Sequence, residues 1–411
     1  MQPRCDEDGL IPLEQALERL LADARTAPRA EYVRLDQAHQ RVVAETVTAP
    51  LALPPFAASA MDGYAVDSRS ARPTQPLAFS QRIAAGQMPE QPLQPDSVAR
   101  LFTGAPLPEG ADTVIPQEAC QVEGNRVRLP KEFTPGQFVR RPGSHVAEGT
   151  PVFEPGRRLG AADIGMLAAL GITRVKVHGR LKVALLTTGN ELVEPGRTLQ
   201  PGQIYDANRH LLNTLLKNFD CEIISPPAVA DEAEAVRDAL SAAAQQADLI
   251  ISCGGVSVGE EDYVKEAVTA LGELALWRLR IKPGKPLAFG RVGQTPFIGL
   301  PGNPVSSFVT FCLLARPYIL KSQGMKEVGA RSFPVRADFD QKQPDGRRNF
   351  LRVTLHEDDE GELWARPYRS QDSATLLSVS RSDGLLCIPE GETIQHGQRL
   401  RFTPFSELIK P

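Results

Sequence analysis

The sequence of 411 residues lacks the features that mark disulfide-stabilised, membrane-spanning or strongly charged proteins. Its six cysteines are scattered without a CxxC pair, which argues against a disulfide framework and against a thiolate zinc site. It has no apolar run of about 18 residues, and its first residues lack a basic stretch followed by an apolar one, so we expect neither a membrane span nor an export leader. The net charge of −4 gives no general footprint for nucleic acid or an anionic membrane. We therefore expect a cytoplasmic protein with reduced thiols.

What the sequence does contain is a change of pattern along its length, as expected of several domains. Apolar residues at helical spacing mark residues 11–25, whereas residues 51–151 consist of short β-like runs broken by proline and glycine. From residue 181, buried strands alternate with helices, which predicts βαβ units and a parallel sheet covered on both faces. Beyond about residue 323, short alternating runs predict a small closed or sandwiched β domain.

A glycine-rich turn follows one of the buried strands of this α/β segment. Gly254, Gly255 and Gly259 stand in the sequence CGGVSVGEEDY, with Ser257 as an additional hydrogen-bond donor. Glycine permits positive φ and a close approach of backbone amides to a phosphate. The turn matches neither the dinucleotide fingerprint nor the Walker A spacing, so a purely structural turn is an equal interpretation.

Two further turns of the same segment suit an anion. Lys282 and Lys285 flank a proline-stiffened turn, and solvated surface lysines are the alternative interpretation. Asn303 and Pro304 stand at a helix start, where free amides and the helix dipole favour negative charge, although ordinary capping explains Asn303 equally well. The occurrence of three such turns in one segment favours a binding site.

Acidic residues after three strands supply a complementary set. Glu191, Asp231 and Asp262 are the kind of oxygen ligands that a hydrated Mg²⁺ shares with substrate phosphates. A simpler interpretation is that Asp231 caps its helix and that Asp262 is a solvated residue. No histidine stands in a context that suggests a general base.

Seven segments across the chain carry specific motifs: PPFAASAMDGYAV (54–66), FTGAPLPEGADTVIPQE (102–118), LLTTGNEL (185–192), IYDAN (204–208), ISCGGVSVGEEDY (251–263), LRIKPGKPLAFG (279–290) and GLPGNPVSS (299–307). In this order they resemble the molybdopterin molybdenumtransferase family, which includes bacterial molybdenum-insertion enzymes, their plant counterparts and the E domain of animal gephyrin.

The resemblance implies a multi-domain α/β plus β protein, with an elongated subunit that forms a homodimer. The expected parts are a discontinuous elongated linking and dimerisation domain (1–45 and 148–178), an inserted mostly β domain (46–147), a parallel-sheet α/β domain that binds the pterin nucleotide (179–328) and a C-terminal small β-barrel (329–411).

The resemblance also assigns roles to individual positions. Glu191, Asp231 and Asp262 would bind Mg²⁺ and the pterin end of the substrate, and Asp62 and Thr103 would reach the cleft from the partner subunit. The catalytic positions implied are Asp62, Glu191, Asp231, Asp262 and Lys285. The binding positions implied are Thr103, Arg140, Gly254, Gly255, Ser257, Lys282, Pro301, Gly302, Asn303, Pro304, Ser306, Arg352 and Ser373, of which Lys282, Arg352 and Ser373, together with Lys285, would hold molybdate.

The implied reaction is the insertion of molybdate into adenylylated molybdopterin, with Mg²⁺-dependent release of AMP and formation of molybdenum cofactor. The expected partners are the adenylylating enzyme of the same pathway and apoenzymes that accept the cofactor, with no nucleic acid or membrane. The sequence departs from the family pattern at Phe138 (usually Asn), His145 (usually acidic) and Asp372 (usually Gly), while Arg140 and Gly143 match. These departures leave open a paralogue with another metal preference, such as tungstate. A dimeric peptide-binding scaffold and an enzyme of the preceding adenylylation step are also compatible with the motifs.

Overall fold

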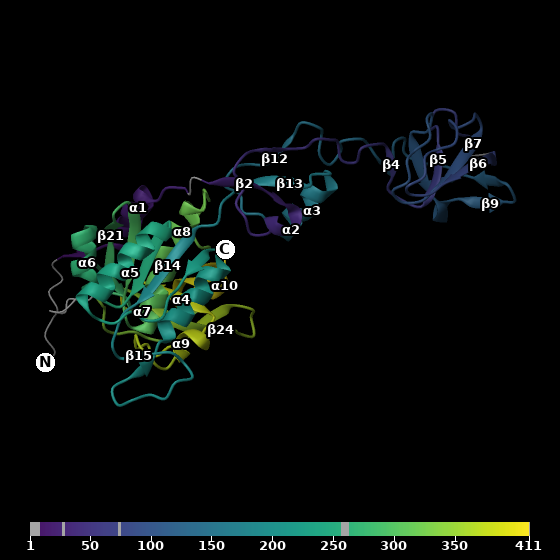
Figure 1. The fold of residues 1–411 in the computed structure, drawn as a ribbon. Helices are drawn as coiled ribbons and strands as arrows, with labels where there is room; N and C mark the ends of the chain where they lie inside the picture. The colour runs from purple at the N-terminus through teal and green to yellow at the C-terminus, as the bar shows by residue number, and fades with distance from the viewer. Residues whose placement is uncertain (1–8, 27–28, 73–74, 256–262, 411) are drawn as a thin grey trace.

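The computed structural model describes residues 9–26, 29–72, 75–255 and 263–410. The chain is elongated, with a large α/β unit and a β-barrel at one end, a bridging unit in the middle and a distal β unit at the other end (Figure 1). This arrangement confirms the predicted multi-domain α/β plus β class. None of the helices within the described residues combines the length and apolar character needed to cross a bilayer.

The α/β unit is built on a seven-stranded sheet with the order β1-β19-β21-β22-β18-β14-β17. In chain order, the strands are β1 (Leu10–Ile11), β14 (Lys182–Thr187), β17 (Glu222–Ile224), β18 (Leu249–Cys253), β19 (Gly272–Leu279), β21 (Pro286–Val292) and β22 (Thr295–Leu300). The half of the sheet from β22 to β17 is parallel, whereas β21 runs antiparallel to both β19 and β22. The short connections beside β21 explain this, because parallel neighbours need a long crossover.

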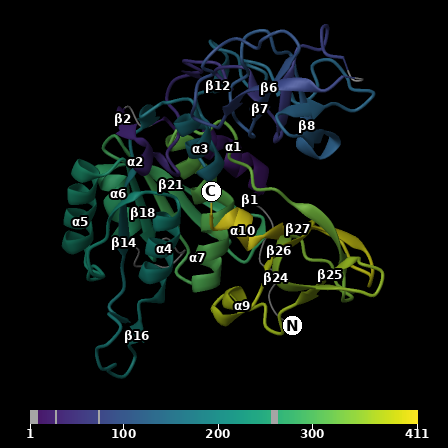
Figure 2. The ribbon, with the colours of Figure 1, turned by 90° about the vertical axis from the view of Figure 1, so that its right-hand side faces the viewer.

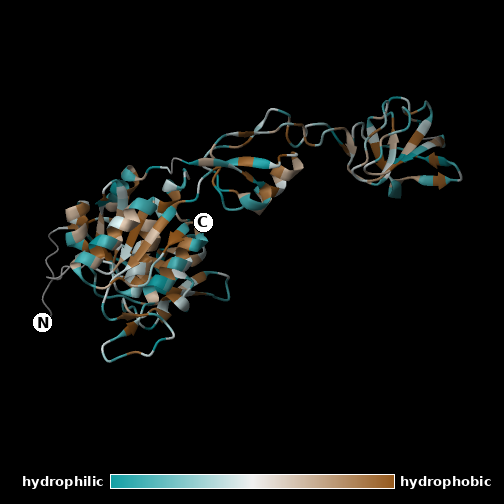
Figure 3. Cartoon of the chain, viewed as in Figure 1, coloured by the Kyte–Doolittle hydropathy of each residue, from teal (hydrophilic) through white to brown (hydrophobic). Residues whose placement is uncertain are grey.

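Helices cover both faces of this sheet, as the apolar strands predict. They are α1 (Leu13–Asp23), α4 (Ala207–Asn218), α5 (Ala233–Gln246), α6 (Tyr263–Leu271), α7 (Pro304–Thr310) and α8 (Arg316–Ser322), the last two joined by a π-helical segment, Phe311–Ala315. Along β14, Val183 and Leu185 pack in the core with α1, α4, α7 and α8, whereas Ala184 and Leu186 pack with α5 and α6. The alternation follows from the two-residue period of a strand. Figure 3 shows these apolar strands between helices with mixed surfaces.

The C-terminal barrel lies beside the α/β unit (Figure 2). Its strands are β23 (Phe333–Ala337), β24 (Arg348–Glu357), β25 (Leu363–Pro367), β26 (Gly384–Ile388) and β27 (Arg399–Pro404), and its short helices are α9 (Leu377–Ser380) and α10 (Phe405–Leu408). Pairing of β24 with β26 closes the ring, which abolishes sheet edges in the predicted small β-barrel. β20 (Ile281–Lys282), which lies in the chain between β19 and β21 of the α/β sheet, pairs with β24 of the barrel and thus joins the two units.

The bridging unit is built from two segments of the chain that are far apart in sequence. Its elements are β2 (Ala30–Arg34), α2 (Leu35–Ala38), β3 (Val47–Thr48), β12 (Pro151–Phe153), α3 (Ala161–Ala169) and β13 (Arg174–His178). Antiparallel pairing of β2 with β13 and of β3 with β12 brings the two halves together. The helix α1, which precedes this unit, packs in the core of the α/β unit. The domain boundaries expected from the sequence stay a prediction.

The distal unit is inserted between the halves of the bridging unit. Its strands are β4 (Ala58–Ser59), β5 (Gly63–Val66), β6 (Leu77–Ile83), β7 (Ser97–Leu101), β8 (Thr113–Pro116), β9 (Gln121–Glu123), β10 (Arg126–Arg128) and β11 (Val139–Arg140), with a 3₁₀ turn at Gln117–Ala119. The six-stranded sheet has the order β8-β5-β7-β6-β10-β9, and β11 pairs with β4.

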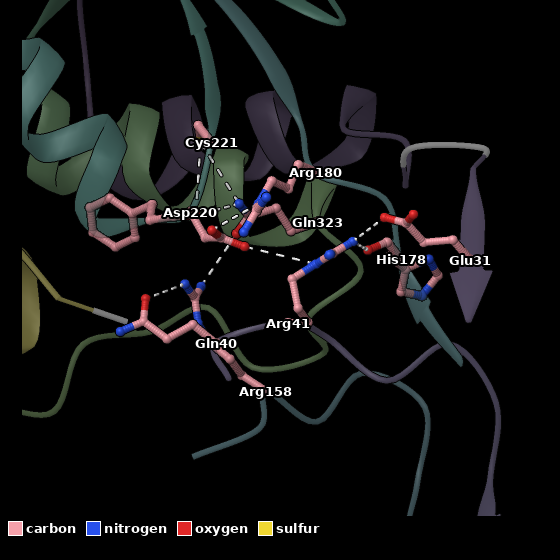
Figure 4. Close-up of polar contacts among 10 residues, drawn as sticks. Glu31, Gln40, Arg41, Arg158, His178, Arg180, Asp220, Cys221 and Gln323 are labelled. Atoms are coloured by element: carbon pink, nitrogen blue, oxygen red, sulfur yellow. Dashed lines mark hydrogen bonds and ion pairs between the residues drawn. The ribbon is translucent and has the colours of Figure 1, made fainter. Parts of the chain in front are cut away.

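Polar side chains join the bridging unit to the α/β unit (Figure 4). Asp220 accepts a hydrogen bond from Arg180 at 2.9 Å and lies 3.8 Å from Arg41, which is itself buried. Arg158 donates to the Gln323 side chain at 3.3 Å, and its Nε has no acceptor among the described residues. Burial lowers the pKa of the Arg158 guanidinium to about 10. These contacts between the two units are ionic and amide in character.

Candidate active site

A cavity of about 730 Å³ opens at the carboxyl ends of β14, β18 and β22. This is the edge at which open α/β sheets bind ligands, and the volume suits a small molecule. Its wall consists of Thr188, Gly189, Glu191, Leu192, Ile204, Tyr205, Asp206, Ala207, Asn208, Asp231, Cys253, Gly254, Gly255, Pro286, Pro301, Gly302, Asn303, Pro304, Ser306 and Ala374.

The glycine turn after β18 contributes Gly254 and Gly255 to the wall. Their φ angles of +96° and +64° lie in the left-handed region, which glycine adopts without steric cost. A Cβ on Gly254 would lie 2.9 Å from the Thr188 carbonyl oxygen, and one on Gly255 would lie 2.4 Å from Cγ2 of Val264. Glycine is thus required here because the end of β14 and the start of α6 approach the turn closely.

The second turn, 301–304, lies directly beside the first. A Cβ on Gly302 would be 3.9 Å from the Gly254 Cα, and the Asn208 amide donates to the Gly302 carbonyl at 2.6 Å. Asn303 is the N-cap of α7, as predicted, but its side chain makes no capping hydrogen bond. Its amide donates instead to the Ser373 hydroxyl at 3.0 Å, and the amide of Val305 donates to the Ser373 carbonyl at 2.9 Å. A loop of the barrel is therefore fastened to this turn.

Among the described residues, three carboxylates line the cavity: Glu191, Asp231 and Asp206. Glu191 folds back toward its own turn, since a Cβ on Gly189 would lie 2.4 Å from the Glu191 Oε2. Asp206 is buried, and it accepts hydrogen bonds from the Thr187 hydroxyl at 2.7 Å and from the Arg209 amide at 3.0 Å.

Part of the expected site cannot be placed. Ser257, Gly259 and Asp262 lie outside the described residues. Within the described residues, no cluster of three acidic, histidine or cysteine side chains has the arrangement of a metal site.

The basic residues expected to hold molybdate take different positions. Lys285 immediately precedes Pro286, which lines the cavity, whereas the Lys282 ammonium is paired with Asp345 of the barrel at 3.2 Å. Arg352 is only 1% exposed, and it donates to the Ser378 hydroxyl and to the Asp372 carbonyl, both at 3.2 Å. Arg352 thus holds the loop that carries Ser373 through the Asp372 carbonyl, and it is not part of the cavity wall.

The Asp372 side chain, which replaces the usual glycine of the family pattern, has a partner of its own. Its Oδ1 accepts a hydrogen bond from the Ala374 amide at 2.7 Å. The carboxylate therefore stabilises the turn that carries Ser373.

The remaining expected residues, Asp62, Thr103 and Arg140, lie together in the distal unit, far from the cavity of the same chain (Figure 1). The Asp62 carboxylate accepts hydrogen bonds from the amide and the hydroxyl of Thr103, both at 2.8 Å. These bonds hold the pKa of Asp62 below its ordinary value. Arg140 lies on β11, opposite Ala58 of β4. Phe138 nearby has a φ of +54°, a conformation that asparagine, the usual residue of the family pattern, adopts more readily.

Sequence reasoning assigned no role to Thr188, Asp206, Asn208 or Cys253, all of which line the cavity. Asp206 and Asn208 belong to the segment IYDAN, and an aspartate at the N-cap of α4 was the signal that could have identified them. Cys253 is the last residue of a buried strand, and its thiol donates to the Pro301 carbonyl at 3.3 Å. Burial raises the pKa of this thiol to about 12.

Comparisons with known proteins identify the family of this chain. Family models match three parts of the chain: the MoeA N-terminal region (domain I and II) over residues 11–171, a probable molybdopterin binding domain over 184–321, and the MoeA C-terminal region (domain IV) over 334–405. A molybdopterin molybdenumtransferase of Haemophilus influenzae is 36% identical, across 97% of this chain and 100% of the relative. One from Nostoc is 37% identical, across 84% of this chain and 81% of the relative.

A solved structure agrees over the same extent. The molybdopterin biosynthesis MoeA protein from Pyrococcus horikoshii superposes with a TM-score of 0.79 and 32% identity, across 96% of this chain and 99% of that one. The full-length similarity and the shared order of units show that the chain belongs to the molybdopterin molybdenumtransferase family, a family of enzymes in molybdenum cofactor biosynthesis.

Proposed function

We propose that this chain transfers molybdate to adenylylated molybdopterin and releases AMP, in a cavity completed by a second copy of the chain. The observation that carries this proposal is the composition of the cavity wall. Two glycine-containing turns meet there with the carboxylates of Glu191, Asp231 and Asp206. Backbone turns of this kind approach phosphates closely, and a site of this size accommodates a pterin nucleotide.

The acidic part of the wall suits Mg²⁺. A phosphoanhydride beside three carboxylates is repelled unless a cation lies between them, and Mg²⁺ commonly uses one or two carboxylates together with substrate phosphates and water. Glu191 and Asp231 would hold the ion, with Asp262 as a further proposed ligand. When bound, the ion would neutralise charge on the phosphoanhydride.

Molybdate would be held where the α/β unit meets the barrel. Lys285 and Ser373 flank the cavity through their neighbours Pro286 and Ala374, which both belong to its wall. Lys282 would contribute a second ammonium group from the same turn, and Arg352 would keep the Ser373 loop in place. The chain would thus position the oxyanion and stabilise charge without a covalent intermediate.

The partner subunit would supply Asp62, Thr103 and Arg140. Within one chain these residues and the cavity lie at opposite ends of an elongated molecule (Figure 1). A homodimer in which the distal unit of one protomer reaches the cavity of the other would bring the two sets together. Closed twofold assemblies of this kind are the most frequent oligomers.

The experiment that tests the proposal is a turnover assay with adenylylated molybdopterin, molybdate and Mg²⁺. We expect AMP release and cofactor that activates a molybdenum-dependent apoenzyme, and both should stop when EDTA removes Mg²⁺. Glu191→Gln should reduce turnover by about 100-fold or more, as loss of a charge-stabilising group does. The matched control is Glu222→Gln, since Glu222 is the first residue of β17 and pairs with Lys182 at the opposite edge of the sheet. An intact substrate after incubation with the wild-type protein would refute the proposal.

A further inference from the structure

We propose that Arg100 is the positioning residue that fixes Asp62 and Thr103 in one geometry. Its effect on the reaction rests on the proposed function, in which Asp62 works in the partner's cavity. Its effect on the conformation of the distal unit does not depend on that function.

The pair to be held consists of two residues on different segments. Asp62 lies between β4 and β5, and Thr103 lies two residues beyond the end of β7. They are joined by the two hydrogen bonds of 2.8 Å from Thr103 to a single carboxylate oxygen, Oδ1. Thr103 is exposed and Asp62 is only half-buried, so surrounding packing alone does little to hold the pair.

Arg100 contacts the chain neighbours of both residues. Its guanidinium donates to the carbonyl of Gly63 at 3.1 Å, next to Asp62. It stacks on the Tyr64 ring, with 5.1 Å from Cζ to the ring centroid, and on the Phe102 ring at 5.0 Å. Tyr64 follows Gly63, and Phe102 precedes Thr103. One planar cation therefore touches both segments.

A third segment is attached to the same guanidinium. Arg100 also donates to the side chain of Gln117, whose backbone amide donates to the carbonyl of Asp62 at 3.0 Å. The contacts thus reach the backbone carbonyls of Asp62 and Gly63 rather than the Asp62 carboxylate itself. Arg100 acts on Asp62 through Gly63 and Gln117, which is the role of a positioning residue.

The geometry requires arginine and not merely a positive charge. A guanidinium has a fixed fork of donors and a flat face for stacking, whereas the lysine ammonium is a point charge on a flexible stem. The Arg100 charge also contributes to the low pKa of Asp62, but after the hydrogen bonds from Thr103. Arg100→Lys keeps the charge and removes the fork, so it separates the two effects.

Hydrogen exchange on the full-length protein tests the conformational part. We expect Arg100→Lys and Arg100→Gln to increase exchange by roughly tenfold in peptides covering residues 58–66 and 100–106, as a total loss of hydrogen bonding of about 1.4 kcal/mol predicts. Peptides covering 185–210, which border the cavity, should not change. The matched control is Arg126→Gln, since Arg126 lies on β10 and donates a single bond to the Pro76 carbonyl.

Three results of this experiment would overturn the inference. Unchanged exchange in both peptides would show that Arg100 holds nothing in place. Wild-type exchange in Arg100→Lys would show that charge alone suffices. Faster exchange over the whole distal unit, including residues 121–128, would assign Arg100 to general stability instead.

Turnover measurements test the functional part. Arg100→Lys should lower kcat by about 10- to 100-fold, the scale of a misplaced catalytic group, with KM for adenylylated molybdopterin unchanged. In an Asp62→Ala background the same substitution should have no further effect, whereas independent additive losses would contradict the inference. Full activity of Asp62→Ala would refute the role of Asp62 and the functional part together. A wild-type protein without turnover would refute the proposed function, and the exchange result would still decide the conformational part.

Discussion

The glycine turn after β18 gives a sharp test of how the cavity is built, through the substitution Gly254→Ala. An alanine at a φ of +96° would take a conformation that costs an L residue roughly 1–2 kcal/mol. Its Cβ would also lie 2.9 Å from the Thr188 carbonyl oxygen, which is backbone and cannot rotate away. Overpacking of this kind costs about 1–3 kcal/mol, so the total destabilisation expected is ~2–5 kcal/mol.

The matched control is Gly302→Ala in the adjoining turn. Gly302 has no left-handed φ, and its nearest neighbour to an added Cβ is the Gly254 Cα at 3.9 Å, an ordinary contact. We expect a change of less than ~1 kcal/mol for this variant.

Calorimetry of both variants beside the wild type measures the difference. For a domain of the size of the α/β unit, a destabilisation of ~2–5 kcal/mol corresponds to a fall in Tm of at least about 4 °C for Gly254→Ala. Equal melting temperatures for the two variants would refute the argument that close approach of Thr188 selects glycine at residue 254.

Three further predictions concern the cavity and the polar contact between units. Asn208→Ala removes the hydrogen bond to the Gly302 carbonyl, so it should lower the free energy of unfolding by ~1 kcal/mol and weaken binding of adenylylated molybdopterin in calorimetric titration. Asn218→Ala, which removes a similar bond to the Ile409 carbonyl away from the cavity, should cost similar stability without affecting binding. Burial raises the Cys253 pKa to about 12, so iodoacetamide at pH 8 should leave this thiol unlabelled in the native protein and label it in urea, as measured by mass spectrometry. Rapid labelling of the native protein would contradict the burial of Cys253. Asp220→Asn keeps the shape of the side chain and tolerates the φ of +55°, but it removes the charge that pairs with Arg41 and Arg180. Small-angle scattering should then show a wider range of overall dimensions for the variant, and a profile equal to that of the wild type would contradict this prediction.

The fold was largely predictable because periodicity reports on packing. The alternation of buried strands and helices from residue 181 predicted a covered α/β sheet, and the strands of β14 and β18 are buried on both faces. The antiparallel position of β21 was not predicted, since it depends on how the short connections on either side place the strand. Proline and glycine punctuation predicted the distal β unit but not its strand order, because pairing joins residues far apart in sequence.

The candidate site was predictable to the extent that its residues follow strand ends. Glu191, Asp231, Gly254 and the turn 301–304 all end or follow strands of one sheet edge, and the structure brings them to one cavity. The positions of Lys282 and Arg352 could not be foreseen. Lys282 is paired with Asp345 across the contact of the α/β unit with the barrel, and Arg352 is bonded to Asp372 by the fold of the barrel itself. Their roles, like those of the other site residues, stay predictions.

The polar joint of Asp220, Arg41 and Gln323 has a mechanical consequence. Water can replace ion pairs and amide contacts of this kind at small cost, whereas separating an apolar interface exposes hydrophobic surface. A rotation of the bridging unit at these contacts would move the distal unit at the end of a long lever, so that a small change of angle becomes a large displacement of the unit that contains Asp62 (Figure 1). The distance from the distal unit to a neighbouring molecule would then change while the separate hydrophobic cores of the α/β, bridging and distal units keep their packing.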